Sequence, residues 1–286
     1  MTESLEGPIW WPAPAKLNLF LHVVGQRPDG YHCLQTVFQI IDLCDGINLS
    51  VRSDGEICHL NPLSGVPQEL DLTVRAARLL QQHANCRQGV DISIQKKIPM
   101  GAGLGGGSSD AATVLVVLNR LWGVDLDKVE LAKLAAKLGA DVPVFVFGRN
   151  AWAEGIGDIL TPVDLEPSWY AIFVPDIHID TSHVFAAEDL TRDSNPITIS
   201  GFLGGYRENT LERVVFSRYS GVRQVVEWLR ARGIKGSMSG SGSAVFATLS
   251  SEEEACRLVE ECPLDCRCFV SAGCEMSPLM KRLPQD

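Results

Sequence analysis

The chain has 286 residues, of which 45% are hydrophobic, so it is long enough to bury a large core and most naturally forms two domains. Its 35 acidic residues outnumber its 25 lysines and arginines, which argues against binding to nucleic acid or to an anionic membrane surface. Any polyanionic ligand must therefore be held by local donors.

The first residues and the cysteines indicate an intracellular protein. Residues 1–16 are acidic where a secretory signal is basic, and the apolar run at 17–25 is too short to span a bilayer. The nine cysteines are odd in number and scattered along the chain, which is typical of reduced intracellular thiols and not of a disulfide framework. We predict a soluble cytoplasmic protein.

Five cysteines gather near the C-terminus, in a spacing that loosely resembles a metal site. The group contains no C-x-x-C pair and has no nearby histidine, so we predict no bound metal there. Its members are Cys256, Cys262, Cys266, Cys268 and Cys274.

An alternating pattern predicts a first strand at residues 12–25. One side carries Ala15, Leu17, Leu19, Leu21 and Val23, and the other carries Lys16, Asn18, Phe20 and His22. A lysine in a strand is by default a solvated edge residue, so Lys16 alone says little. A turn at 28–30 and a second apolar run at 33–43 predict a hairpin, with Tyr31 and His32 at the exit of the turn.

Five glycines fall within residues 101–107, between a predicted strand at 90–94 and a predicted helix that starts near Ser108 and continues to Leu121. Glycine loses much entropy on ordering, so such a cluster needs a reason, such as the close approach of a ligand to the main chain. A strand, a glycine loop and a helix start together form anion-binding architecture, because free N–H groups and the helix dipole meet there.

Three known glycine loops fit this stretch poorly. A dinucleotide fold would continue into a second strand ending in an acidic residue, but the next element is a predicted helix at 125–138. A Walker loop needs a lysine after its glycines, and protein kinases need H-R-D and D-F-G. These are absent, so we predict a phosphate loop of another lineage.

Asp141 follows that helix and precedes a predicted apolar strand at 142–147. Aspartate beside glycine is by default part of a turn, so alone it carries little information. A carboxylate that accepts a hydroxyl proton near a lysine would, however, form a minimal kinase centre.

The second half alternates predicted strands and helices, which is typical of an α+β sandwich. A second glycine and serine loop lies at 233–243, between a helix and a strand. Two such loops at element junctions favour a shared ligand cleft. We place the change of domain near residues 161–166.

Five stretches carry a family resemblance: PAPAKLNLFL, DGYH, PMGAGLGGGSSDAA, GADVPVFVFG and GSMSGSGSAVFA. In this order and spacing the chain resembles the kinases named for galactokinase, homoserine, mevalonate and phosphomevalonate kinases (GHMP kinases), over nearly its whole length. The resemblance implies a ribosomal-protein-S5-domain-2-like domain at 1–160, a ferredoxin-like sandwich at 161–286, and an active site in the cleft between them.

The resemblance also implies ATP with Mg²⁺ and a small-molecule acceptor, the 2-hydroxyl of diphosphocytidyl methylerythritol. It implies Lys16 and Asp141 as the catalytic pair, with Asp141 as base. The implied nucleotide-binding residues are Lys96, Pro99, Met100, Gly101, Ala102, Gly103, Leu104, Gly105, Gly106, Gly107, Ser108 and Ser109. The implied substrate-binding residues are Asn18, Tyr31, His32, Thr181 and Phe185, with an aromatic sandwich around the cytosine. We expect a monomer or weak homodimer without a nucleic-acid or membrane partner.

Two positions depart from the family pattern. Asp71 stands where relatives often have asparagine, near the expected adenine. Asp110 ends the glycine loop, where it could help hold Mg²⁺ or cap the helix, and we favour the cap.

Three alternatives remain open: a kinase for another small alcohol, an inactive nucleotide sensor of the same fold, and a metal-dependent redox or scaffold protein built on the C-terminal cysteines. The retention of both Lys16 and Asp141 argues against the sensor.

Overall fold

The computed structural model describes residues 8–284. Residues 1–7, on which part of the targeting argument rests, lie outside the described residues. Within that range no helix has both the length and the apolar character needed to cross a bilayer. Helices and strands are mixed along the chain, in agreement with the predicted α+β class.

Up to residue 162 the elements are β1 (Trp11–Gln26), β2 (His32–Arg52), β3 (Ile57–His59), α1 (Leu72–Ala84), β4 (Gly89–Gln95), α2 (Gly106–Leu121), α3 (Lys128–Ala136), α4 (Val142–Phe147), β5 (Ala151–Glu154) and β6 (Ile159–Pro162). They are followed by β7 (Trp169–Pro175), α5 (Thr181–Phe185), α6 (Ile199–Leu203), α7 (Glu212–Arg218), α8 (Ser220–Arg230), β8 (Gly236–Met238), β9 (Val245–Leu249), α9 (Glu252–Glu260), β10 (Cys266–Cys274) and α10 (Pro278–Arg282).

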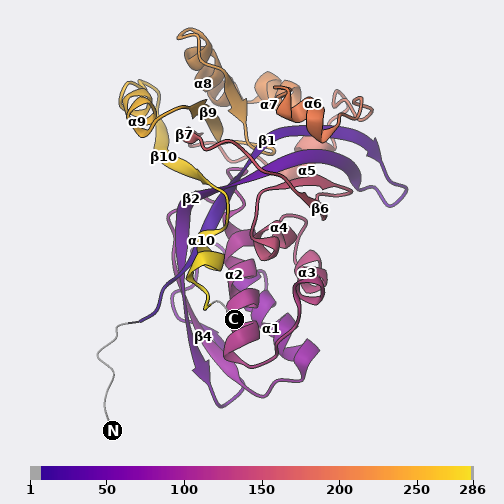
Figure 1. Cartoon of the computed structure of the whole chain (residues 1–286), viewed down its shortest axis with the longest axis vertical. Coiled ribbons are helices and arrows are strands. Elements are labelled where there is room, and N and C mark those ends of the chain that lie inside the picture. Colours follow the sequence, from indigo (N-terminus) through magenta and orange to yellow (C-terminus); the bar gives the residue numbers. More distant parts are fainter. Residues whose placement is uncertain (1–7, 285–286) are drawn as a thin grey trace.

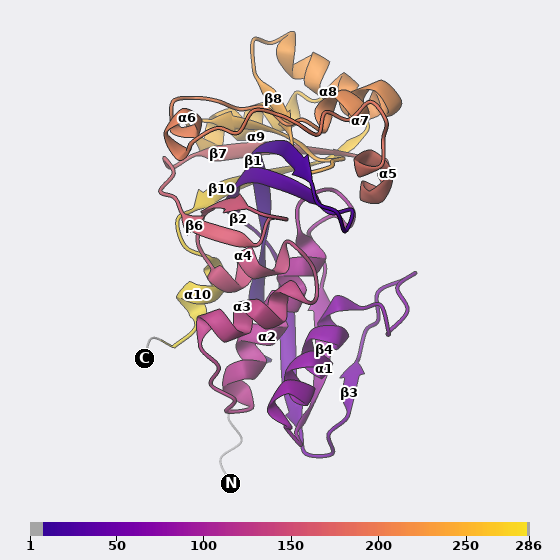
Figure 2. The same cartoon turned by 90° about the vertical axis from the view of Figure 1, so that its right-hand side faces the viewer.

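The predicted hairpin is the long antiparallel pair β1 and β2, in which Trp11 lies opposite Ile47 and Gln26 opposite His32. Its turn closes where the Arg27 N–H donates to the Tyr31 carbonyl at 2.7 Å, with Gly30 at a φ of +90° that favours glycine. Both cartoon views show the hairpin linking the lower elements, α1–α4 and β4, to the upper elements, α7–α9 and β7–β9 (Figures 1 and 2).

One sheet joins the two halves, with strand order β3-β4-β2-β10-β7-β9-β8; β1 and β5 also pair with β2, and β6 pairs with β5. The last strand, β10, is antiparallel to both β2 and β7. After it the chain returns to the first half, because Leu279 and Leu283 belong to the same buried cluster as α2. In both views α10 accordingly lies among the lower elements (Figures 1 and 2).

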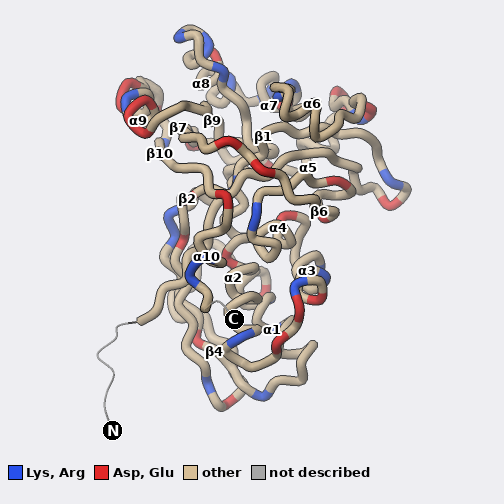
Figure 3. Tube along the Cα trace, in the orientation of Figure 1, with Lys and Arg blue, Asp and Glu red and all other residues tan. Residues whose placement is uncertain are grey.

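Helix α2 forms the centre of that first core, where its apolar side chains pack with α1, α4 and the inner face of β2 and β4. A second cluster joins α7 and α8 to β7 and β9, and a third surrounds the middle of β1. Acidic and basic residues are interspersed along α8 and α9 (Figure 3).

One prediction about local structure is wrong here. Residues 142–147 form a helix, α4, and not a strand, because all-round burial removes the periodicity that separates the two; Pro143 in the first turn and Gly148 at the left-handed C-cap were the available helix signals. Lys16 departs from the default of a solvated edge residue, since both faces of β1 are covered and Lys16 is only 2% exposed.

Candidate active site

A cavity of about 910 Å³ lies where the β1–β2 hairpin, the first glycine loop, the start of α4 and the second glycine loop meet. Most of the predicted site residues line it: Lys16, Asn18, Tyr31, His32, Lys96, Pro99, Met100, Gly101, Ala102, Gly103, Gly105, Gly106, Gly107, Ser108, Asp141, Thr181 and Phe185. Leu104 and Ser109 do not, because both are fully buried. The carbonyl of Leu104 instead accepts the Lys16 backbone N–H at 3.0 Å and ties the loop to β1.

The first glycine loop ends at Gly105, whose φ of +72° is left-handed, and α2 begins at Gly106. The helix therefore starts two residues earlier than the serines suggested, and its N-cap makes no side-chain hydrogen bond. The predicted capping role of Asp110 is wrong for this reason, since Asp110 lies inside the helix. The first backbone N–H groups of α2, beginning at Gly106 and Gly107, have no partner within the helix and lie at the cavity wall.

The two glycine loops support each other. Ser239 Oγ donates to the Gly103 carbonyl at 2.9 Å, and the Ala244 N–H donates to the Ala102 carbonyl at 3.0 Å. A Cβ at Gly103 would lie 2.1 Å from the Ser239 carbonyl oxygen, so only glycine allows this approach. Gly240 and Ser241 of the second loop line the same cavity, which agrees with the predicted shared cleft.

Lys16 and Asp141, far apart in the sequence, form an ion pair at the cavity wall. Lys16 Nζ lies 3.2 Å from Asp141 Oδ2, and it also donates to Asn18 Oδ1 at 2.5 Å. The Lys16 side chain is 3% exposed, whereas that of Asp141 is 36% exposed. The carboxylate can therefore meet a ligand while the ammonium group is held behind it.

Asn18 was predicted to bind substrate, and its amide is occupied within the protein. Its Oδ1 accepts from Lys16, and its Nδ2 donates to Thr36 Oγ1 at 2.9 Å. Thr36 in turn donates to the Phe20 carbonyl at 2.5 Å. This chain orients the Lys16 ammonium group toward Asp141.

Lys96 lies at the same cavity in a different environment. Its Nζ contacts Asp45 Oδ2 and, at 2.8 Å, Asp110 Oδ2, and both carboxylates are buried. Burial raises the pKa of Asp110 to about 7; attraction to Lys96 opposes the rise and repulsion from Asp45 adds to it. Backbone N–H groups of Lys97 and Ile98 donate to Asp45 Oδ1, so the cluster anchors the segment before the loop.

Aromatic residues form the far end of the cavity. Tyr31 is 60% exposed, and the rings of His32 and Phe185 lie 5.1 Å apart at an angle of 31°. Arg192 Nε donates to His32 Nε2 at 3.2 Å, and because arginine only donates, His32 carries its hydrogen on Nδ1. Burial, together with the Arg192 charge, lowers the pKa of His32, which favours this neutral ring.

Asp71 and Thr181 contribute at the cavity rim. Asp71 caps α1, accepting from Thr73 and bonding to His59 Nδ1 at 2.8 Å. Burial alone would raise the pKa of Asp71, but the hydrogen bonds from His59 and Thr73 outweigh it and lower the pKa to about 2. Thr181 Oγ1 lies 2.7 Å from Ser241 Oγ, which joins α5 to the second glycine loop.

Known proteins match this chain over almost its whole length. Residues 71–149 match the GHMP kinases N terminal domain, and residues 186–266 match the GHMP kinases C terminal domain. The chain is 50% identical over 270 residues to the 4-diphosphocytidyl-2-C-methyl-D-erythritol kinase of Nitrosococcus oceani, covering 94% of this chain and 96% of that one. It is 51% identical over 273 residues to the protein of that name from Alkalilimnicola ehrlichii, covering 96% and 94%.

The chain is a GHMP kinase of the 4-diphosphocytidyl-2-C-methyl-D-erythritol kinase family. A crystal structure of 4-(cytidine 5'-diphospho)-2C-methyl-D-erythritol kinase superposes with a TM-score of 0.81 at 35% identity, covering 93% of this chain and 100% of that one. Homoserine kinase from Cytophaga hutchinsonii superposes at 0.70 with 17% identity, over 96% and 98% of the two chains, and shares the fold. The predicted family and GHMP kinase fold are confirmed.

Sequence reasoning missed several residues that organise the site of this GHMP kinase. Arg192 binds His32 and also donates to the carbonyls of Phe185 and Ala187, so it holds the aromatic end together. Asp45 holds Lys96, and Ser239 holds the first glycine loop. Only their residue types could have indicated these roles, because each of the three residues contacts a partner that is distant in the sequence.

Proposed function

We propose that this chain transfers the γ-phosphoryl group of ATP to the 2-hydroxyl of 4-diphosphocytidyl-2-C-methyl-D-erythritol, with Asp141 as general base and Lys16 as its electrostatic partner. The observation that carries the proposal is the 3.2 Å contact between Lys16 Nζ and Asp141 Oδ2, at the wall of a cavity that the glycine loop also lines.

In the proposed complex the ATP phosphates lie against the start of α2. Both nearby lysines already have carboxylate partners, Lys16 with Asp141 and Lys96 with Asp45 and Asp110. Backbone N–H groups of the loop and the positive end of the helix dipole must therefore supply most of the attraction for the phosphates. This suits a chain with a formal net charge of -10.

Mg²⁺ would bind together with ATP and would partly neutralise the negative charge of the β- and γ-phosphates. It would be held largely by phosphate oxygens and water. The residue that fits it is Asp110, which lines the cavity and whose buried Oδ1 has no hydrogen-bond partner among the described residues.

The proposed acceptor extends toward the aromatic end. A cytosine ring presents two apolar faces and an edge with donors and acceptors. Exposed Tyr31 offers a ring, and His32 offers an Nδ1–H donor on its free edge. The ring centroids of Phe185 and His32 are 5.1 Å apart in this structure, which leaves no room for a base between the two rings. Phe185 must therefore shift if the base is to lie between aromatic rings.

In the proposed transfer the acceptor hydroxyl gives its proton to Asp141 while its oxygen bonds to the γ-phosphorus. The bond from that phosphorus to the bridging oxygen of ADP breaks, and ADP leaves with the electron pair. Lys16, fixed by Asn18, offsets negative charge that develops beside the carboxylate. For the domain organisation we propose 1–160 and 161–286, a division that lies between the two matched family domains, with the exception that α10 packs back into the core of the first half.

The test is a substrate panel at fixed Mg-ATP, with ADP release as the measurement. Diphosphocytidyl methylerythritol, homoserine and mevalonate are compared, and the phosphorylated position is read from the ³¹P–¹³C couplings of the product. We expect release of ADP with the cytidyl alcohol alone and a phosphate on its 2-hydroxyl. Comparable turnover of homoserine or mevalonate would support the alternative of another small-alcohol kinase, and ATP binding without any turnover would support the sensor.

A further inference from the structure

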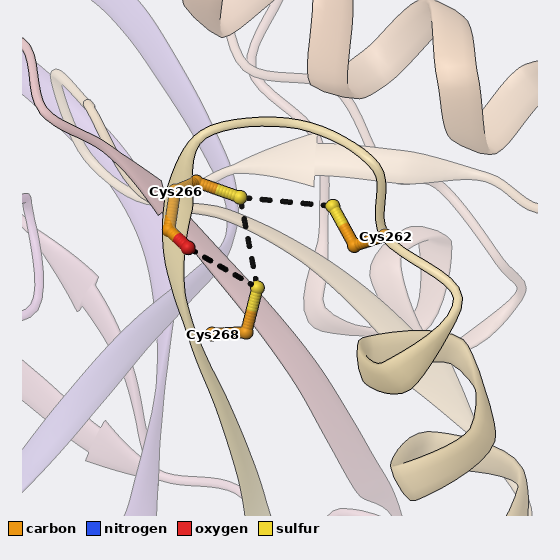
Figure 4. A group of neighbouring side chains, drawn as sticks. All are labelled: Cys262, Cys266 and Cys268. Carbon is orange, nitrogen blue, oxygen red and sulfur yellow. Dashed lines mark hydrogen bonds between the residues drawn. The ribbon is translucent and has the colours of Figure 1, made fainter.

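Three of the nine cysteines converge outside the kinase cavity. Cys262 follows α9, and Cys266 and Cys268 lie at the start of β10 (Figure 4). The Sγ atoms of Cys262 and Cys266 are 3.7 Å apart, those of Cys266 and Cys268 are 3.6 Å apart, and all three sulfurs lie within 4.8 Å of one another. Each residue is half-buried, and none lines the kinase cavity.

The local fold holds the sulfurs together. Alternate residues of a strand point to the same face, so Cys266 and Cys268 share one side of β10. The strand is fixed by its pairing with β7, where Cys266 lies opposite Pro175 and Cys268 opposite Phe173. The Cys262 N–H donates to the Val259 carbonyl at 3.2 Å, which curls the end of α9 back toward the strand.

The separations fit coordination better than a disulfide. Two sulfurs bound to one tetrahedral ion at a metal–sulfur distance of about 2.3 Å lie about 3.8 Å apart. The measured 3.6 and 3.7 Å are close to that edge length, whereas a disulfide needs about 2.05 Å. Little movement is therefore needed for the three sulfurs to share one ion.

We propose that Cys262, Cys266 and Cys268 form a three-thiolate site for a thiophilic cation of the Zn²⁺ type, separate from the kinase cavity. The fourth position is left to water or a small exogenous ligand, since the group is partly exposed. Our expectation of no metal here rested on the missing C-x-x-C pair, but the strand and the helix end bring the thiols together without one.

Metal binding would join the end of α9 to β10 and release the thiol protons. Burial raises the pKa of both Cys266 and Cys268, and each neighbouring thiol affects the other, so these groups are protonated at neutral pH in the absence of a cation. A cation that binds the folded chain and not the unfolded one also stabilises the fold, by mass action.

The test is a titration of the full reduced chain with Co²⁺, followed by displacement with Zn²⁺. We expect thiolate-to-cobalt charge-transfer absorption that saturates at one equivalent and disappears when Zn²⁺ is added. Cys262→Ser and Cys268→Ser each remove a metal ligand. Loss of an outer-shell partner lowers metal affinity by about 10–100-fold, and loss of a ligand should lower it by at least as much. Cys86→Ser, a half-buried cysteine outside the group, is the matched control and should bind as the parent does.

Two results would overturn the proposal: Co²⁺ binding without a thiolate band, or a band that survives unchanged in Cys268→Ser. A second measurement on the parent chain covers the case in which a variant does not fold. Zn²⁺ should then protect Cys262, Cys266 and Cys268 from alkylation, as read by peptide mass spectrometry, and leave the other six cysteines as reactive as before. Equal protection of cysteines outside the group would also count against the site.

Discussion

Lys16 and Lys96 line the same cavity, yet their ammonium groups have different surroundings. Lys16 faces a single carboxylate, Asp141, that is 36% exposed and open to a ligand. Lys96 faces Asp45 and Asp110, whose side chains are 0% and 2% exposed. The first pair resembles a reactive group with its partner, and the second resembles a structural anchor.

The difference indicates that a lysine beside the proposed phosphate site can serve as an anchor for buried carboxylates. An ammonium group shared by two buried carboxylates is already neutralised, and removing it would leave both acids without a cation. The Lys16 ammonium group is paired with one carboxylate that is partly exposed, so its removal leaves no fully buried acid without a cation. Substitution at the two lysines should therefore affect different measurements.

The largest expected effect is on catalysis, at the first pair. Asp141→Asn should lower kcat by about 10²–10⁴, the usual contribution of a general base, with little change in the melting temperature because the side chain is partly exposed. Lys16→Met should act on the same step. Because the two residues work as a unit, the double variant should be far less impaired than the product of the single losses, and multiplicative losses in steady-state kinetics would separate their roles.

The second effect is on stability, at the other lysine. Lys96→Met leaves Asp45 and Asp110 buried without their cation and should reduce the free energy of unfolding by about 3–5 kcal/mol. Lys16→Met is the matched comparison and should cost less, about 1–3 kcal/mol, because it leaves the Asn18 Oδ1 and one partly exposed carboxylate without the ammonium group. Urea denaturation of both variants measures this, and the reverse ranking would contradict the comparison.

A third substitution asks whether the main chain, and not either lysine, holds the phosphates. A Cβ at Gly107 would meet only Leu72 Cδ1, at 3.7 Å, so Gly107→Ala should fold normally and gain about 0.4–1 kcal/mol. Its methyl group would stand where the phosphates are proposed to lie, and we expect the affinity for ATP to fall about tenfold or more, the worth of one charge-assisted hydrogen bond. Calorimetric titration with ATP checks this, and unchanged affinity would remove the phosphates from this position.

Gly105 does not serve as such a test. Its φ is +72°, and a Cβ there would lie 2.9 Å from Phe145 Cζ and 3.1 Å from Lys16 Cε. A valine at this position would strain the backbone and displace Lys16, so lost activity would not distinguish binding from folding.

The smallest effect concerns pH. Burial raises the pKa of Asp110 to about 7, and burial likewise raises the pKa of Glu212, which accepts the Met238 N–H, to about 7. Between about pH 4 and 7 the folded chain then holds more protons than the unfolded chain, so these groups make stability fall as pH rises. Buried His22 and half-buried His32, whose pKa values are lowered chiefly by desolvation, act in the opposite direction near their ordinary range.

The difference in unfolding free energy between the parent and Asp110→Asn isolates the contribution of this one carboxyl group to the pH dependence of stability. Relative to the parent, the variant should become more stable from pH 6 to pH 7 by about 1 kcal/mol, because it lacks the carboxyl group that must ionise. Denaturation at both pH values measures the shift. A difference that does not depend on pH would mean that Asp110 stays charged beside Lys96 throughout.

Much of the fold was predictable because its signals are local. The hairpin, α2, α3 and the strands of the second half follow from alternation, from turn residues and from helical periodicity. The error at 142–147 arose where burial on all sides removes any periodicity. The start of α2 was placed too late because serines are common caps, whereas here a left-handed glycine begins the helix.

By itself, the sequence determined the family, the position of the glycine loop and the residue types of the candidate site, because glycine patterns, turns and apolar periods act over a few positions. Only the tertiary structure decided which carboxylates hold Lys96, that Arg192 sets the hydrogen of His32, and that three thiols of the C-terminal group converge. Such contacts join residues across long stretches of chain, and their strength depends on burial and distance, which no short stretch of sequence specifies.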